Sequence, residues 1–158
     1  MKSKTKTYIW CVILTLVVGG LSALLTMGNM DIYDEIIKGP LAPPAIVFPI
    51  VWGILYILMG ISLAQVIVKG RQDGIYTLPA IKSYVIQLAV NFFWSIIFFN
   101  LRNFLLSFVW LLFLWMLIVN MIVKFYKVNK ASAWLNVPYL LWVTFAGWLN
   151  FMIYILNK

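Results

Sequence analysis

Amide and aromatic side chains recur at helical spacing in an uncharged stretch of the chain, QLAVNFFWSIIFFN at residues 87–100. At about 100° per residue, four of them fall within an arc of roughly 60° on one face of a helix: Gln87, Asn91, Trp94 and Phe98. An amide that faces hydrocarbon leaves its hydrogen bonds unmade, which costs free energy. We therefore expect this stripe to face protein or a cavity.

Two other apolar segments give aromatic stripes by the same construction. One stripe comprises Trp52, Tyr56, Met59 and Leu63, and the other comprises Trp142, Ala146 and Leu149, flanked by Phe145 and Asn150. If the three faces converge, they line an apolar cavity with amide and phenol groups as orienting contacts, which suits a large planar ligand. The alternative is that the aromatic residues only pack or form interfacial belts, and that the amides join helices.

Several other chemistries lack the residues that they need. The chain contains no His and only one Cys, and its long apolar segments contain no Asp or Glu. A histidine-ligated haem, a zinc site, a Ser-His-Asp triad and a carboxylate dyad are therefore disfavoured, as is proton-coupled pumping. We expect no metal site and no cofactor of the protein's own. Binding or passage of an apolar molecule remains, as does chemistry supplied by the ligand itself.

The elements that carry these residues are long enough to cross a membrane. The 158-residue chain is 65% hydrophobic and only 10% charged. We place spans at 8–27, 45–68, 83–101, 104–125 and 133–156, because about 20 apolar residues cross the hydrocarbon layer. Backbone groups in lipid must be satisfied internally, so these spans are helices. The sequence predicts an all-α polytopic membrane protein, a bundle of five transmembrane helices forming one domain over residues 1–158.

The charged residues predict orientation rather than a nucleic-acid partner, although the net charge is +8. Nine basic residues belong to the side that carries the N-terminus: Lys2, Lys4, Lys6, Lys69, Arg71, Lys82, Lys124, Lys127 and Lys130. The other side carries Lys38, Arg102 and Lys158. This bias predicts a cytoplasmic N-terminus and an outer C-terminus. The first loop, residues 28–44, then lies outside, and a loop of this length is more often functional than a bare connector.

Three motifs resemble one known family. PPAIVFPIVWGILYILMG (43–60), QLAVNFFWSIIFF (87–99) and VPYLLWVTFAGWLNFMIYILN (137–157) occur in this order. They are similar to the tryptophan-rich sensory protein/translocator protein family (TspO/MBR, the peripheral-type benzodiazepine receptor family), and the chain resembles a bacterial member. Where family members often have Trp before the second span, this chain has Leu41 and Ile46.

The resemblance implies a five-helix protein of a bacterial cell membrane, usually a homodimer, whose first outer loop forms a lid over a pocket. That pocket takes porphyrins such as protoporphyrin IX and synthetic benzodiazepine-site ligands. By motif position, the resemblance places eight residues in it: Trp52, Tyr56, Asn91, Trp94, Trp142, Phe145, Ala146 and Leu149. These coincide with the three stripes, and the helical construction adds Gln87 and Phe98.

The leading hypothesis is a membrane receptor on which Trp52, Trp94 and Trp142 stack against a metal-free porphyrin, while Asn91 and Tyr56 bond to its polar edge. A second hypothesis is light-dependent porphyrin degradation with Trp52 and Trp142 as reacting groups, an activity that the resemblance suggests. A third is a tetrapyrrole or lipid transporter. A fourth is a structural subunit without small-molecule affinity.

Overall fold

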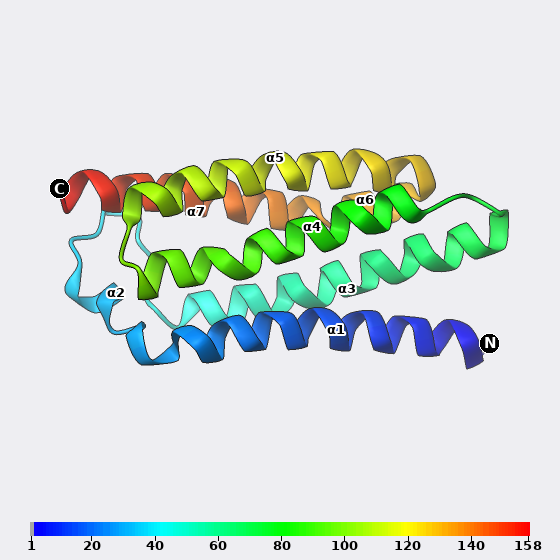
Figure 1. Ribbon diagram of the computed structural model, residues 1–158, viewed down its shortest axis with the longest axis horizontal. Coiled ribbons are helices and arrows are strands. Elements are labelled where there is room, and N and C mark those ends of the chain that lie inside the picture. Colours follow the sequence, from blue (N-terminus) through cyan, green and yellow to red (C-terminus); the bar gives the residue numbers. More distant parts are fainter. Residues whose placement is uncertain (1) are drawn as a thin grey trace.

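The computed structural model describes residues 2–158 and contains five long helices, each of which runs antiparallel to the next long helix along the chain (Figure 1). The secondary structure, in chain order, is α1 (Lys2–Thr26), η1 (Met27–Asn29), α2 (Ile32–Glu35), α3 (Val47–Asp73), α4 (Leu78–Ser95), η2 (Ile96–Asn100), α5 (Phe104–Val128), α6 (Lys130–Trp134) and α7 (Val137–Leu156). The part of the chain that the structure describes contains no strand. The predicted all-α architecture with five membrane-spanning helices is confirmed.

The helix ends follow from local sequence. Gly74 ends α3 in a left-handed conformation with a φ of 66°, which glycine adopts without steric cost. The side chain of Asn103 caps α5 by accepting a hydrogen bond from the backbone N–H of Leu106 at 3.0 Å. Pro49 and Pro138 lie in the first turns of α3 and α7, where no intrahelical N–H donor is required. Each proline therefore lies in the first turn of its helix and does not kink it.

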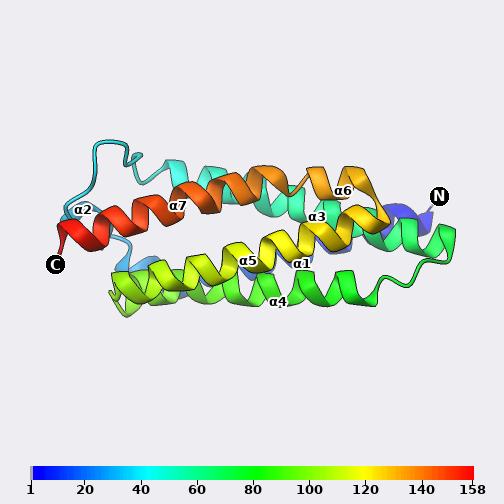
Figure 2. The same cartoon turned by 90° about the horizontal axis from the view of Figure 1, so that it is seen from above.

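The long helices pack on one another in the order α3, α1, α4, α5 and α7. α1 packs chiefly on α3 and also on α4, while α5 packs on both α4 and α7. Figure 2 shows α7 and α3 on one side of the bundle and α4 and α5 on the other. The chain ends lie at opposite ends of the bundle, and α2 lies at the same end as the C-terminus (Figure 1). The first loop thus covers the end where α1, α3, η2 and α7 meet.

The backbones of α1 and α3 come close together at Gly60 of α3. A Cβ atom there would lie 2.6 Å from the Cα of Val12 and 3.0 Å from the carbonyl oxygen of Cys11. Only a residue without a side chain lets the α1 and α3 backbones approach this closely. Gly60 therefore sets the spacing of these two helices below the level of the cavity.

Candidate functional site

A cavity of about 570 Å³ lies beneath the first loop. It is walled by α1, the loop, α3, the end of α4 with η2, and α7, and every lining side chain is uncharged. Its size lies within the range of small-molecule sites. An uncharged, largely apolar chamber in the bundle is suited to an apolar ligand and unsuited to a hydrated ion.

Six of the ten predicted ligand-binding residues line this cavity: Trp52, Tyr56, Trp94, Phe98, Ala146 and Leu149. The indole rings of Trp52 and Trp94 lie with their centroids 6.2 Å apart, and Trp52 stacks on Tyr56 at 5.5 Å. Three spans thus converge around one hollow, as the stripes predict. The wall that results is rich in flat aromatic faces.

Gln87 and Asn91 do not line the cavity but form a polar layer next to it. Tyr56 donates its O–H to Asn91 Oδ1 at 3.2 Å, and Asn91 Nδ2 donates to the hydroxyl of Tyr139 at 2.6 Å. Tyr139 in turn donates to Gln87 Oε1 at 2.8 Å. Gln87 and Tyr139 are fully buried, and Asn91 is 2% exposed. The two amides therefore join α3, α4 and α7 and hold the phenol of Tyr56 at the wall.

Tyr139 is the centre of this network, and its removal gives a clear test. In Tyr139→Phe, Gln87 Oε1 loses the donor of its hydrogen bond and Asn91 Nδ2 loses its acceptor. Because buried groups without partners are destabilising, we expect the free energy of unfolding to fall by about 1–2 kcal/mol. Denaturant unfolding in detergent, followed by circular dichroism, measures this. Tyr76→Phe, at a 74% exposed side chain, is the control, and equal stability of the two variants would contradict the assignment.

A π-helical turn shapes the wall next to Trp94. In η2 the N–H of Leu101 donates to the carbonyl oxygen of Ile96 at 3.0 Å, five residues earlier. Phe98 and Phe99 of this turn both line the cavity, and their ring centroids lie 4.9 Å apart. Such turns occur often at functional sites. Trp94 itself is fixed by donation from Nε1 to Asn150 Oδ1 at 3.2 Å.

Trp142 and Phe145 stand outside the cavity wall. Trp142 lies behind Phe48, with ring centroids 5.8 Å apart, and contacts Phe145 at 5.5 Å. Phe48, not Trp142, lines the cavity. Of the two residues predicted for photochemistry, the structure therefore places only Trp52 at the wall, and Trp94 is the second indole there.

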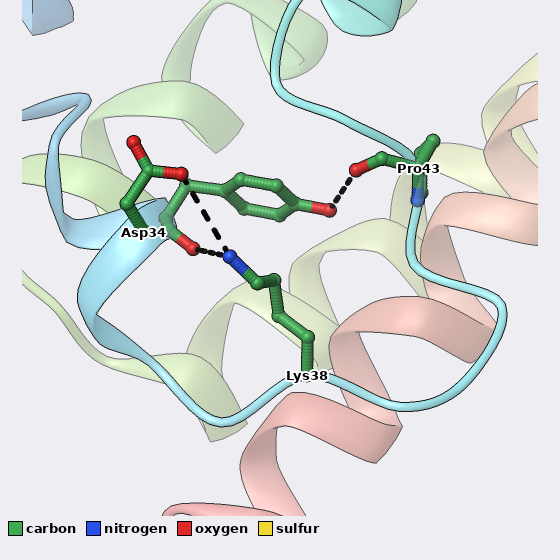
Figure 3. A network of polar contacts seen from close by, with 4 residues as sticks. Asp34, Lys38 and Pro43 are labelled. Atoms are coloured by element: carbon green, nitrogen blue, oxygen red, sulfur yellow. Dashed lines mark hydrogen bonds and ion pairs between the residues drawn. The ribbon is translucent and has the colours of Figure 1, made fainter.

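The first loop covers the cavity as a structured lid. Tyr33 lines the cavity and donates its O–H to the carbonyl oxygen of Pro43 at 2.8 Å. Burial, and to a smaller extent the charge of Asp34, raise the pKa of Tyr33, so this donor stays protonated at neutral pH. The ammonium of Lys38 lies 4.4 Å from the Tyr33 ring centroid and donates a hydrogen bond to the carbonyl oxygen of Tyr33 (Figure 3). It also lies 3.8 Å from Oδ1 of Asp34.

The lid is also tied to the end of α7. Ile37 donates its backbone N–H to Asn157 Oδ1 at 3.0 Å, and Asn157 Nδ2 donates to the carbonyl oxygen of Ile37 at 2.9 Å. At the other side, Asn29 donates to Asn100 Oδ1 at 2.9 Å. Two positions near the lid have no Trp where the resemblance to the family leads one to expect it. Of these two, Ile46 lines the cavity, while Leu41 is 66% exposed.

The helical stripes miss the contribution of α1. Six cavity residues come from this helix: Leu16, Gly19, Gly20, Ser22, Ala23 and Thr26. A Cβ at Gly19 would overlap the ring of Tyr56, so this glycine makes room for the phenol. Gly20 and Gly53 have open space beside them instead. Small residues that resemble a simple packing seam in the sequence thus also leave room in the cavity.

Fold and site together define a polytopic membrane protein with an aromatic cavity among its helices, under a structured loop. Comparison with known proteins narrows this class. The chain belongs to the TspO/MBR family, whose sequence pattern matches residues 11–156.

Named relatives span bacteria and animals. The tryptophan-rich protein TspO of Chlorobaculum tepidum is 36% identical over 158 residues, covering 99% of each chain. Protein CrtK of Rhodobacter capsulatus is 38% identical over 125 residues, covering 79% of this chain and 78% of that protein. The translocator protein of Bos taurus is 31% identical over 137 residues, covering 84% and 79%. This chain is therefore similar to both groups over most of its length.

Proposed function

We propose that this protein is a membrane receptor that binds a porphyrin of the protoporphyrin IX type in the cavity beneath the first loop. The observation that carries the proposal is the pair of indoles, Trp52 and Trp94, side by side in an uncharged cavity of about 570 Å³. A flat macrocycle stacks on such faces without needing polar partners around its rim. Without His in the chain, the metal-free macrocycle is the better match.

The polar edge of the ligand has a counterpart in the lid. Protoporphyrin IX carries two propionates, whose charges cannot be left inside an apolar cavity. Lys38 lies over the ring of Tyr33, which lines the cavity, so its ammonium is close to the covered mouth. We propose that the macrocycle lies against the cavity wall that the two indoles form, while its propionates point to the lid.

Titration of protoporphyrin IX in detergent, followed through the ligand's own absorption band, tests the receptor proposal. We expect saturation at one ligand per chain, and competition by a benzodiazepine-site ligand that fits the same cavity. Linear, non-saturable uptake equal to that of empty detergent micelles would overturn the proposal. A porphyrin signal is preferred to Trp fluorescence because the chain contains eight Trp.

Lys38→Met gives a charge-specific prediction for the lid. A partly exposed ion pair contributes about 1 kcal/mol, so we expect about fivefold weaker binding of protoporphyrin IX. The dimethyl ester of the same porphyrin has no carboxylate and is expected to bind both proteins equally. An equal loss of affinity for both ligands would show that the substitution alters the cavity and not a charge contact.

Light-dependent degradation is a second candidate, favoured by the contact between two electron-rich indoles at the wall. It predicts loss of the porphyrin band under illumination that slows when Trp52 and Trp94 are both Phe. An unchanged rate in that variant would reject this activity and leave the receptor proposal intact.

A further inference from the structure

A second hollow lies at the other end of the bundle, away from the lid. It has a volume of about 370 Å³ and lies between the start of α4 and the end of α5, which run side by side (Figure 2). Lys82 and Ile86 line it from α4, and Leu117, Asn120 and Lys124 line it from α5. At these spacings the residues of each helix share one face. Two facing stripes therefore form a groove that is cationic at one end and apolar at the other.

Within residues 2–158, neither ammonium group of this groove, that of Lys82 or that of Lys124, has an acidic partner. Of the four acidic residues, three are in the lid at the far end, and the fourth, Asp73, pairs with Lys69 at 2.7 Å. Within residues 2–158 the structure records no ion pair to Lys82 or Lys124. Lys124 is nevertheless half-buried. Lys82 is exposed, and two like charges that line one groove repel each other unless an anion neutralises them.

The position of the groove identifies the kind of anion. Lys82 lies about one turn after the start of α4 at Leu78, and Lys124 about one turn before the end of α5 at Val128. Charged groups at this position in a span reach the headgroup layer of a bilayer. Ile86 and Leu117 lie one to two turns deeper, and Ile86 is 51% exposed. The groove thus has its charge at headgroup depth and its apolar part at acyl-chain depth.

We propose that this groove binds one anionic phospholipid, with Lys82 and Lys124 holding the headgroup phosphate and an acyl chain lying along Ile86 and Leu117. Asn120 supplies an amide donor in the same groove. A second copy of the chain is a poorer occupant, because a matching surface would bring four lysines together. The site is separate from the aromatic cavity and does not depend on what that cavity binds.

Native mass spectrometry of the detergent-solubilised protein tests this proposal. The probes are palmitoyl-oleoyl phosphatidylglycerol and phosphatidylcholine with the same acyl chains. We expect one phosphatidylglycerol to remain bound in preference to phosphatidylcholine. Replacing Lys82 or Lys124 by Gln is expected to weaken phosphatidylglycerol about fivefold, and replacing both about twenty-five-fold, because each lysine contributes a similar electrostatic attraction.

Matched variants separate a built site from general charge. Lys127→Gln with Lys130→Gln removes the same charge at the same end of the bundle and is expected to keep the lipid preference. Lys82→Arg with Lys124→Arg is also expected to keep it. Equal loss in the Lys127 and Lys130 control would overturn the proposal. So would displacement of the lipid by millimolar inorganic phosphate alone, which would indicate a site for a free anion.

Discussion

Replacing Trp52 and Trp94 together with Ala is expected to weaken protoporphyrin IX binding about 100-fold. Both indoles line the cavity, and the loss of one buried aromatic contact reduces affinity by roughly 1–2 kcal/mol. Because the two rings contact each other, the effect of the double substitution is expected to differ from the sum of the single substitutions. Titration through the porphyrin absorption band measures it without relying on the Trp residues that are removed.

The control for this pair removes two other Trp residues. Trp10 and Trp134 are 68% and 66% exposed, and neither lines the cavity. Trp10→Ala with Trp134→Ala is expected to leave porphyrin affinity within about twofold of the wild type. A similar loss in both double variants would mean that the porphyrin partitions onto aromatic surface in general, and that the cavity has no special role.

Gly60→Ala is expected to reduce the free energy of unfolding by about 2 kcal/mol, and Gly60→Leu by more. The added Cβ meets the Val12 backbone, which cannot rotate away as a flexible side chain does, so α1 and α3 must separate. Denaturant unfolding in detergent provides the measurement. Larger residues at position 60 should also weaken porphyrin binding, because the cavity lies between these same helices.

Gly147→Ala is the matched control for Gly60, with the opposite expected sign. A Cβ at Gly147, within α7, meets no atom within 4 Å. Since Ala stabilises a helix interior relative to Gly, this variant should be more stable by up to about 1 kcal/mol. Two glycine-to-alanine changes that destabilise equally would contradict the role assigned to the α1–α3 contact.

The sequence predicts those parts of the fold and site that depend on repeating patterns. Five long apolar segments require five spanning helices, and this prediction is confirmed. The 100° construction places Trp52 and Tyr56 on one wall and Trp94 and Phe98 on another, where the structure has them. A stripe defines a face of a helix, however, and does not define how deep along the helix the cavity extends. Gln87 and Asn91 share a face with Trp94 but lie beyond the cavity, next to Tyr139.

The remaining features depend on packing between helices, which no single stripe specifies. Trp142 shares a face with Ala146 and Leu149, yet Phe48 stands between it and the cavity. Phe98 and Phe99 both line the cavity from a π-helical turn, whereas the 100° construction assumes a regular helix and selects only Phe98. Tyr139 is one of two Tyr residues in the apolar segment 133–156, and its sequence context does not signal the network that it centres.

The most direct measurement of the central claim is porphyrin affinity after the cavity is filled from the inside. Gly53 lines the cavity and has open space at its Cβ position, so we expect the side chain of Gly53→Phe to occupy part of the cavity. Gly20→Phe on α1 should act in the same direction. Gly28 has the same open space but does not line the cavity, which makes Gly28→Phe the control. We expect titration with protoporphyrin IX to show affinity at least about 30-fold weaker for Gly53→Phe and unchanged for Gly28→Phe. Wild-type affinity in the folded Gly53→Phe protein would contradict the claim that the porphyrin occupies this cavity.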